Sequence, residues 1–482
     1  MHSESLGGIV GQGDRIREMI AGVGQTLNPD TVRAMHAPGE LTSIAVPRPG
    51  GGPTELVYLT AMADAQRVLT EVAEPLRSSA GTVATVLPWA SGVGTCAAAD
   101  GQLLTGSVLV FAPEGVYALQ VPRSSQRSVQ EPSTERSAFG PKDALIENLE
   151  DDVALIRSHL RDPRLRVEHM QLGTDAPTDV ALLYVNGVVD GAMVDEARDR
   201  LARYRAPRVG FVSSLLRPLF GAIWDGFLPA DFSERPYRIA DFLSRGRLAI
   251  LVDGSPFAMI LPLFFIELFI DEEEYLQATL TRYFIRALRM LSFLIAVFGP
   301  GLYVAIMAVN PTVVPGLLAV AVASSRQALP YPIFTEILLM LIIIDILTEA
   351  TVSQKSLLGP AISIVGGLVA GQAAVRANLA SNLGVIVVSV TMLATFMTSR
   401  LYITYSARIW KYMILVLSEL LGLVGWSTGI ALLLVVFTSH RQLGAHYLAP
   451  LAPLRAHDLP SPSLAGRHRR APRYVRQPRA TP

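Results

Sequence analysis

Long apolar runs in the second half of the chain constrain its fold more than any other feature. The 200 residues 241–440 hold only 22 of the 82 charged side chains in this 482-residue sequence. A helix needs about 20 mostly apolar residues to cross the hydrocarbon core of a bilayer. The sequence therefore predicts a soluble region followed by an all-α polytopic membrane domain.

Six apolar runs are candidate membrane segments, and we expect four to six helical crossings. The runs are Leu248–Ile270, Ala287–Val309, Ile333–Leu347, Gly359–Val375, Leu383–Thr398 and Tyr412–Thr438. The first run contains two prolines and two acidic residues, so a broken or interfacial element is an alternative to a crossing there.

Basic residues lie on both sides of the last apolar run. The tail from Ser439 holds eight arginines and one aspartate, which by the positive-inside rule predicts a cytoplasmic location. Arg400, Arg408 and Lys411 precede the run and predict the same location for its other end. A single crossing cannot satisfy both, and we give the tail more weight. Its Pro/Arg-rich composition predicts disorder and contact with anionic lipid.

Two stretches of the soluble region resemble each other. Residues 56–64 and 182–190 are β-branched and aromatic runs, each followed by a turn and a helical pattern, which predicts two α/β subdomains. Between them, residues 108–111 and 115–119 predict a β-hairpin. We expect a flexible segment at 1–53, subdomains at 54–145 and 146–235, the membrane domain at 236–440, and a disordered tail at 441–482. Residues 1–15 lack the apolar stretch of a secretory signal, which predicts a cytoplasmic N-terminal region.

Composition excludes several functional classes. A net charge of zero argues against a nucleic-acid partner, and no lysine follows a glycine, which excludes a P-loop. Cys96 is the only cysteine, so we expect a buried thiol and no thiolate metal cluster. The G-x-S-x-G pattern around Ser427 lies in an apolar run, where glycine and serine are ordinary helix-packing residues, so helix packing is favoured over a hydrolase nucleophile elbow. We expect no catalytic residue, metal or cofactor.

Small residues recur every fourth position in one apolar run. They are Gly359, Ser363, Gly367 and Gly371, which share one helix face. In lipid, small residues let helix backbones approach closely. Packing within the chain and a subunit interface are both open. Gln372 follows the stripe and is a candidate for a polar lumen or for a hydrogen bond to a neighbouring helix.

Three acidic residues lie in the run that begins at Ile333. Asp345 and Glu349 share one helix face, and Glu336 points roughly the opposite way. Carboxylates within a membrane are costly, and they face a partner, a bundle interior or a water-filled path. The sequence therefore predicts a polar or ion path along this helix. Interfacial positions in water are the alternative for Glu336 and Glu349.

Several motifs, taken in order, resemble the A-subunit family of bacterial spore germinant receptors, the GerA and SpoVAF-like proteins. They include residues 160–163 (LRDP), Asp253-Gly254-Ser255-Pro256, Pro330-Tyr331-Pro332 and residues 371–375 (GQAAV). The resemblance covers roughly Asp143 to Pro453.

The resemblance implies a two-part cytoplasmic domain and a multi-pass domain in the inner spore membrane. It implies an oligomeric subunit that works with a transporter-like B subunit and a lipoprotein C subunit and couples nutrient sensing to ion movement. It includes no catalytic residues. Leu341 stands where relatives usually carry a glutamate, and Thr348 where they carry an arginine, so one carboxylate of the expected polar stripe is missing.

Two alternatives stay open at this point. An accessory SpoVAF-type subunit would amplify germination without a nutrient-binding partner of its own. An independent secondary transporter would carry an inverted membrane repeat, whereas the repeat in this sequence lies in the soluble half.

Overall fold

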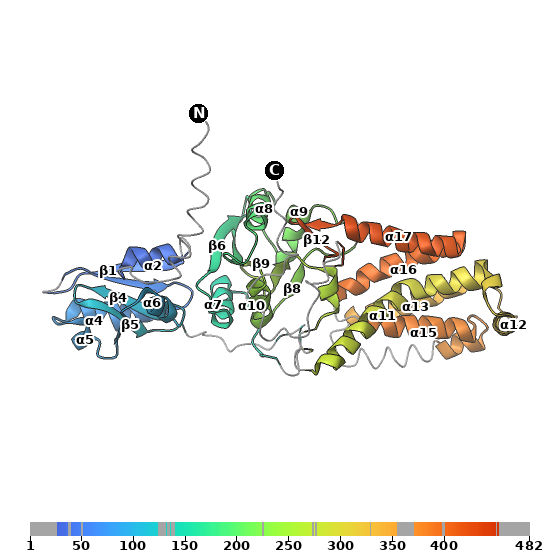
Figure 1. The fold of residues 1–482 in the computed structure, drawn as a ribbon, viewed down its shortest axis with the longest axis horizontal. Helices are drawn as coiled ribbons and strands as arrows, with labels where there is room; N and C mark the ends of the chain where they lie inside the picture. Colours follow the sequence, from blue (N-terminus) through green and yellow to red (C-terminus); the bar gives the residue numbers. More distant parts are fainter. Residues whose placement is uncertain are drawn as a thin grey trace, which may run out of the picture. The chain divides into compact units, whose positions relative to one another are not determined.

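A computed structural model describes most of the chain. It describes residues 27–36, 40–49, 52–123, 132, 135, 140–223, 226–271, 274, 277–327, 329–353, 371–397, 401–449 and 451–452. An N-terminal α/β region precedes a helical region (Figure 1). The chain divides into two compact units after Pro262, and residues 222–229 belong to the second unit.

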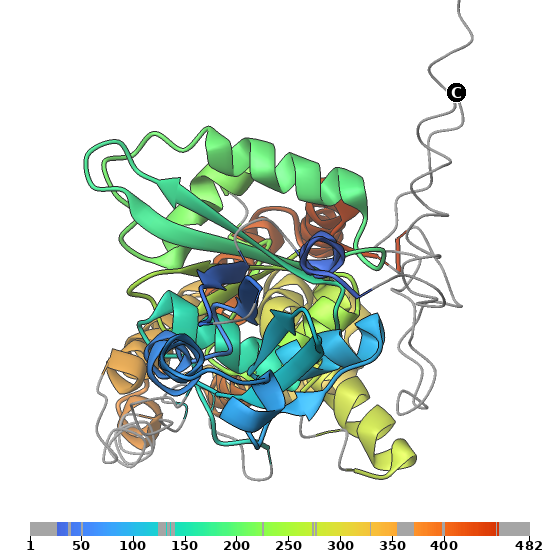
Figure 2. The same ribbon diagram turned by 90° about the vertical axis from the view of Figure 1, so that its left-hand side faces the viewer.

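The first sheet is antiparallel, with strand order β1-β2-β4-β5-β3 (blue in Figure 2). Its strands are β1 (Leu41–Val46), β2 (Thr54–Leu59), β3 (Ser91–Gly92), β4 (Ser107–Ala112) and β5 (Gly115–Gln120). The predicted hairpin is confirmed by the pairing of β4 with β5. Since β1 belongs to this sheet, the prediction of a flexible segment over the whole of residues 1–53 is wrong.

Helices cover both faces of the first sheet. They are α2 (Pro29–Met35), α3 (Ala65–Arg67), a π-helix (Val68–Ala73), α4 (Glu74–Ser78), α5 (Val83–Val86) and α6 (Cys96–Leu103). Leu56 and Tyr58 pack with the layer from the π-helix to α5, whereas Val57 and Leu59 pack with α2 and α6. Alternate residues of a strand point to opposite faces, so the stretch Leu56–Leu59 of β2 is apolar on both faces. Cys96 is buried, as predicted.

The second sheet repeats the topology of the first. Its strands are β6 (Leu165–Leu172), β7 (Thr178–Val185), β8 (Asp231–Ser233), β9 (Leu248–Val252) and β10 (Ala258–Leu261). Their order, β6-β7-β9-β10-β8, equals that of the first sheet when each set is numbered from its own first strand. The flanking elements are α7 (Leu149–His159), α8 (Gly191–Ala202), a 3-10 helix (Val212–Leu215), α9 (Leu216–Phe220) and α10 (Pro236–Ser244).

The apolar run Leu248–Ile270 is not a membrane segment, so this prediction is wrong. It forms β9, β10 and a 3-10 helix at Phe265–Phe269. Every residue of β9 and β10 is buried, and a strand covered on both faces is as apolar as a membrane segment. The predicted start of the membrane domain at residue 236 is wrong for the same reason, because residues 230–262 belong to the first unit.

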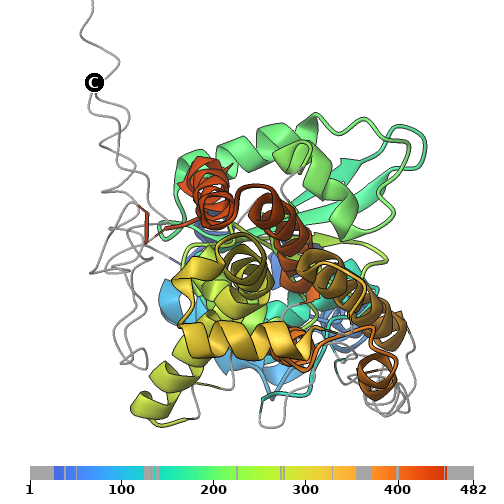
Figure 3. The same ribbon diagram turned by 90° about the vertical axis from the view of Figure 1, so that its right-hand side faces the viewer.

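The second unit is helical (Figure 3). Its helices are α11 (Thr279–Val304), continued by a π-helix (Ala305–Val309), α12 (Gly316–Ser325), α13 (Ile333–Ser353), α15 (Asn382–Phe396), α16 (Leu401–Leu421) and α17 (Leu423–Ser439). Among the described residues, the continuous stretch Thr279–Val309 alone is both long and apolar enough to cross a membrane, and α15 and α17 are shorter apolar helices.

The sequence predicted a single crossing over Tyr412–Thr438, and this prediction is wrong. The run contains parts of two helices, α16 and α17. The chain reverses at Gly422, whose φ of +60° lies in the left-handed region that glycine adopts without strain. The side chain of Asn310 accepts a hydrogen bond from the backbone N–H of Leu423 (2.9 Å) and so caps α17.

Glycines let α17 pack closely against α16. A Cβ on Gly425 would lie 1.8 Å from the carbonyl oxygen of Leu417, and one on Gly429 would lie 2.8 Å from the Ile414 side chain. Later residues of α17 thus contact earlier residues of α16. The two helices therefore form an antiparallel hairpin.

The start of the predicted disordered tail is ordered, so this prediction is wrong for residues 441–449. β11 (Arg441–Gln442) pairs with β12 (Ala445–His446). The buried Gln442 side chain accepts a hydrogen bond from the backbone N–H of Leu263 (3.0 Å). Tyr447 is 1% exposed and packs with Phe265 and Phe437. Residues 453–482 lie outside the described residues.

Candidate functional site

Asp345 of α13 lies in an ion pair with α16. Its carboxylate is 3.0 and 3.2 Å from Nζ of Lys411, and it accepts a hydrogen bond from the hydroxyl of Tyr412 (2.6 Å). The Lys411 side chain is only 6% exposed. Removal of one partner from such a buried pair strongly destabilises a protein, because the remaining charge is left unpaired in the interior.

Glu349 extends the same contact by one helical turn. It lies 3.1 Å from Nη1 of Arg408, and Nε of Arg408 lies 3.5 Å from Asp345. Two carboxylates of α13 thus face two cations of α16, and the group is electrically balanced. The sequence predicted the shared face of the two carboxylates but not their partners. The available signal was the three-residue spacing of Arg408 and Lys411, which places both on one face of α16.

Glu336 is separate from this group and lies in the protein interior. It is 1% exposed, forms an ion pair with Arg326, and accepts hydrogen bonds from the backbone N–H and the hydroxyl of Ser381 (both 2.6 Å). Ser381 in turn caps α15 through the backbone N–H of Gly384 (3.0 Å). A Cβ on Gly384 would lie 2.2 Å from the Glu336 carboxylate, so the glycine makes room for it. Glu336 therefore joins α13 to the start of α15.

The small-residue stripe falls mostly outside the described residues, which exclude Gly359, Ser363 and Gly367. Gly371 lies in a helical stretch that is described at 371–376, and a Cβ built on it would meet no described atom within 4 Å. Gln372 follows it and is exposed.

The motif Asp253-Gly254-Ser255-Pro256 forms the turn between β9 and β10. The Asp253 carboxylate accepts a hydrogen bond from the backbone N–H of Leu149 (3.2 Å), which is the first residue of α7. Gly254 has a φ of +80°, and Ser255 is 3% exposed. This motif therefore holds the start of α7 against the second sheet.

Asp152 lies on the same helix and is buried. Burial raises the pKa of its carboxyl to about 8, although a hydrogen bond from the backbone N–H of Ile146 (2.7 Å) acts in the opposite direction. The nearby acidic side chains of Asp151, Asp253 and Glu147 raise the pKa further.

Pro330 and Pro332 belong to the turn that precedes α13. The carbonyl of Pro332 accepts the backbone N–H of Glu336 (3.2 Å), which is the first helical hydrogen bond of α13, and Pro330 is exposed. Both prolines therefore lie just before the start of a helix.

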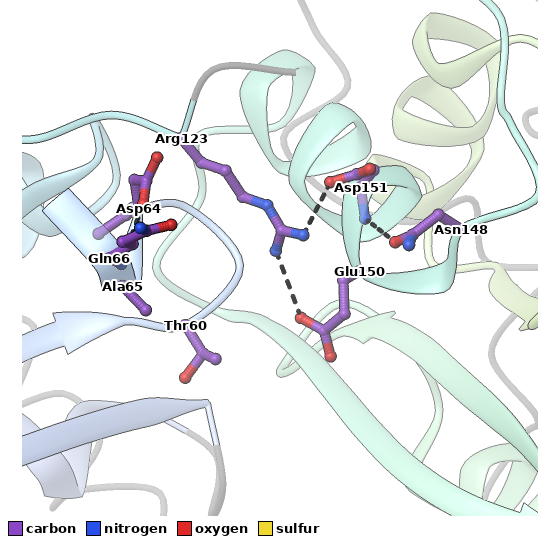
Figure 4. A pocket seen from close by; sticks show the side chains of 9 residues that line it. Thr60, Asp64, Ala65, Gln66, Arg123, Asn148, Glu150 and Asp151 are labelled. Atoms are coloured by element: carbon purple, nitrogen blue, oxygen red, sulfur yellow. Dashed lines mark hydrogen bonds and ion pairs between the residues drawn. The ribbon is translucent and has the colours of Figure 1, made fainter. Parts of the chain in front are cut away.

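A polar cavity of about 560 Å³ lies within the N-terminal region (Figure 4). Arg123 lies in its wall, 3.0 Å from Asp151 and 3.9 Å from Glu150, while Asp64 and Asn148 cap α3 and α7. The side chains that line this cavity thus bind one another and the helix ends, and they include no nucleophile beside a base. No cluster of metal-ligating side chains occurs among the described residues.

The chain thus combines a two-sheet α/β region with a helical region whose helices carry paired charges. The chain belongs to the Bacillus/Clostridium GerA spore germination protein family, whose sequence profile matches residues 43–478.

Three curated relatives illustrate the similarity. Spore germination protein KA of Bacillus subtilis is 35% identical over 73% of this chain and 65% of its own length. Spore germination protein GerLA of Bacillus cereus is 34% identical over 68% of this chain and 67% of its own length. Spore germination protein A1 of Bacillus subtilis is 31% identical over 72% of this chain and 73% of its own length. The chain thus spans just under two thirds of the length of the first relative.

One solved structure is also similar. It is the crystal structure of the N-terminal domain of the A subunit of the Bacillus megaterium spore germinant receptor GerK3. The sequence identity is 20% and the TM-score is 0.36, and the match covers 50% of this chain and 96% of that one.

Proposed function

We propose that this chain is a non-enzymatic membrane subunit of a germinant-receptor-type complex and couples nutrient sensing to ion release in spore germination. Its membership of the GerA family and the names of its relatives support a role in germination. The observation that carries the coupling role is the group of paired charges between α13 and α16. Charged side chains within apolar helices are costly, and they mark ion paths or the contacts that gate them.

In this proposal the pairs of Asp345 with Lys411 and of Glu349 with Arg408 hold the ion path closed. While each carboxylate is bound to a cation of α16, it cannot attract a mobile cation. Separation of α13 from α16 would leave Asp345 and Glu349 free to line the path. Glu336 would remain fixed to α15 and would not take part.

We further propose that the chain forms homo-oligomers and works with a transporter-like B subunit and a lipoprotein C subunit. The stripe of Gly359, Ser363, Gly367 and Gly371 would allow close packing between neighbouring copies. A Cβ built on Gly371 meets no atom of the described residues within 4 Å, which supports a contact with a neighbouring copy.

We place the helical region in the inner spore membrane, with the N-terminal region in the cytoplasm. The candidate crossings are α11, α13, the run Gly359–Val375, α15, α16 and α17, which is an even number. The α16–α17 hairpin supports this topology, because Arg408 and the tail after Ser439 both lie at its open end. The positive-inside rule then places both basic segments in the cytoplasm.

Release of ions from spores on nutrient exposure tests the coupling role. Lys411→Met removes the cation that binds Asp345, and we expect ion release at lower nutrient levels or without nutrient. Asp345→Ala and Gly367→Leu should impair nutrient-triggered release. The proposal would fail if all three variants assembled and released ions as the wild type does. Slowed release after deletion of the gene, in place of lost release, would favour the accessory SpoVAF-type role.

A further inference from the structure

A buried group of four ionisable side chains connects the two sheets of the N-terminal region. His36 follows α2, Glu40 precedes β1, Asp100 lies on α6, and Arg157 lies on α7. The first three flank the first sheet, whereas Arg157 belongs to a helix that covers the second sheet. The side chains of all four are at most 8% exposed.

Glu40 is the residue that reaches across to the second sheet. Its Oε1 accepts hydrogen bonds from Nη2 of Arg157 (2.7 Å) and from the backbone N–H of Val167 in β6 (3.0 Å). Arg166 of β6 adds a further link, because its Nη1 donates to the carbonyl of Met35 in α2 (2.6 Å).

His36 lies between the two carboxylates of this group. Its Nε2 is 3.0 Å from Oδ1 of Asp100, and its Nδ1 is 3.6 Å from Oε2 of Glu40. Arg157 already balances the Glu40 charge. Among the described residues, His36 is the one ion-pair partner of Asp100, so a proton on His36 is what balances the Asp100 charge. With a neutral imidazole, the group would hold a net charge of −1 in the protein interior, which is costly.

We propose that His36 is a proton-dependent latch, which keeps the two N-terminal sheets docked while it is protonated and loosens them when it loses its proton. Loss of the proton leaves Asp100 as an unbalanced buried carboxylate next to Glu40. Water reaches such a charge most readily if the contacts of Glu40 with Arg157 and Val167 open. Protonation is thereby coupled to the contact between the sheets.

The electrostatic surroundings of His36 support this coupling. Burial lowers the pKa of His36, but the neighbouring carboxylates of Asp100 and Glu40 outweigh it and raise the pKa above the usual 6.5. The other charged or titratable groups near the contact are Arg157, Arg166, and His169 and Glu150, which line an adjoining cavity of about 210 Å³. Because the folded-state pKa is raised, the stabilisation is complete below pH 6.5 and is lost as the pH rises through the folded-state pKa.

Hydrogen exchange of the full-length chain in detergent tests the latch. Protection of the backbone amides in α7 and β6 is measured from pH 5.5 to 8.5 and corrected for intrinsic exchange rates. In the wild type we expect protection to fall by up to about tenfold per pH unit above the pKa of His36, since one proton is involved.

Two variants and a control make the test specific. His36→Gln cannot take up a proton, so it should give weak protection that does not depend on pH. Asp100→Asn removes the charge that the proton balances, so it should give strong protection at every pH, and it tests the latch even if His36→Gln does not fold. His159→Gln is the matched control: it also removes a histidine paired with an aspartate, Asp143, but away from the latch. It should behave as the wild type. Protection that stays constant with pH in the wild type, or that keeps the wild-type pH dependence in Asp100→Asn, would overturn the proposal.

Discussion

At the scale of single residues, the pair of Asp345 and Lys411 explains why charges persist in an apolar helix. Each side chain is the main partner of the other, and the Lys411 side chain is 6% exposed. We predict that Asp345→Ala costs about 3–5 kcal/mol of stability, because it leaves a buried ammonium group without its carboxylate. The melting temperature of the detergent-solubilised protein measures this loss.

The double variant Asp345→Ala, Lys411→Met is the control for this prediction. It removes both charges together, so we expect it to recover most of the lost stability. Equal melting temperatures for the single and the double variant would contradict the importance of the pair.

Asp152 gives a second prediction at this scale. Its pKa is raised to about 8 in the fold from 3.8, so its contribution to stability is complete below pH 3.8 and is lost as the pH rises through about 8. Asp152→Asn keeps the acceptor for the Ile146 N–H without the charge, and should raise stability at pH 8 by roughly 1–3 kcal/mol. Melting curves from pH 5 to pH 9 check this. The advantage of the variant should grow with pH, and a constant difference would contradict it.

The sequence predicted part of the candidate site correctly at the residue scale. Helical spacing was enough to place Asp345 and Glu349 on one face. Their partners could not be predicted, because Arg408 and Lys411 lie about 60 residues later and their pairing depends on how α16 packs against α13. Glu336 was ambiguous for the same reason, since its contact with Ser381 forms only when α13 and α15 meet.

At the scale of elements, the α16–α17 hairpin depends on close approach at Gly425. We predict that Gly425→Ala destabilises the second unit by about 1–3 kcal/mol, because the new Cβ would lie 1.8 Å from the Leu417 carbonyl oxygen. Thermal unfolding in detergent measures the effect. Gly316→Ala is the matched control, since a Cβ there meets no described atom within 4 Å. Equal stability of the two variants would contradict the tight packing of the hairpin.

The elements also show where an apolar pattern misleads. The strands β9 and β10 are buried on both faces, so their composition matches that of a membrane segment. The turn at Gly422 occupies one residue within an apolar run, and only the backbone conformation reveals it. By contrast, the hairpin of β4 and β5 was predictable because a polar turn separates two short apolar runs.

At the scale of the whole molecule, the hairpin predicts the topology of the last two helices. In a Cys96→Ala background, we expect cysteines at Tyr405 and Ser439 to react with an impermeant thiol reagent from the same side of the membrane. A cysteine at Leu421, next to the turn, should react from the other side. All three positions are exposed on the protein. Labelling of Tyr405 and Ser439 positions from opposite sides would contradict the hairpin.

The two sheets of the N-terminal region were partly predictable from the sequence. The sequence indicated the repeat from two strand-and-helix stretches, and the strand orders of the two sheets are the same. The position where the N-terminal α/β region ends was not predictable, because β8, β9 and β10 complete the second sheet only after a long excursion of the chain.

We propose above that the chain works as an oligomeric subunit of a membrane receptor complex. The most direct test is the mass and composition of the complex extracted in detergent from cells that produce it. We predict several copies of this 52.0-kDa chain together with a transporter-like protein and a lipoprotein. A single copy of the chain without either partner would contradict the claim.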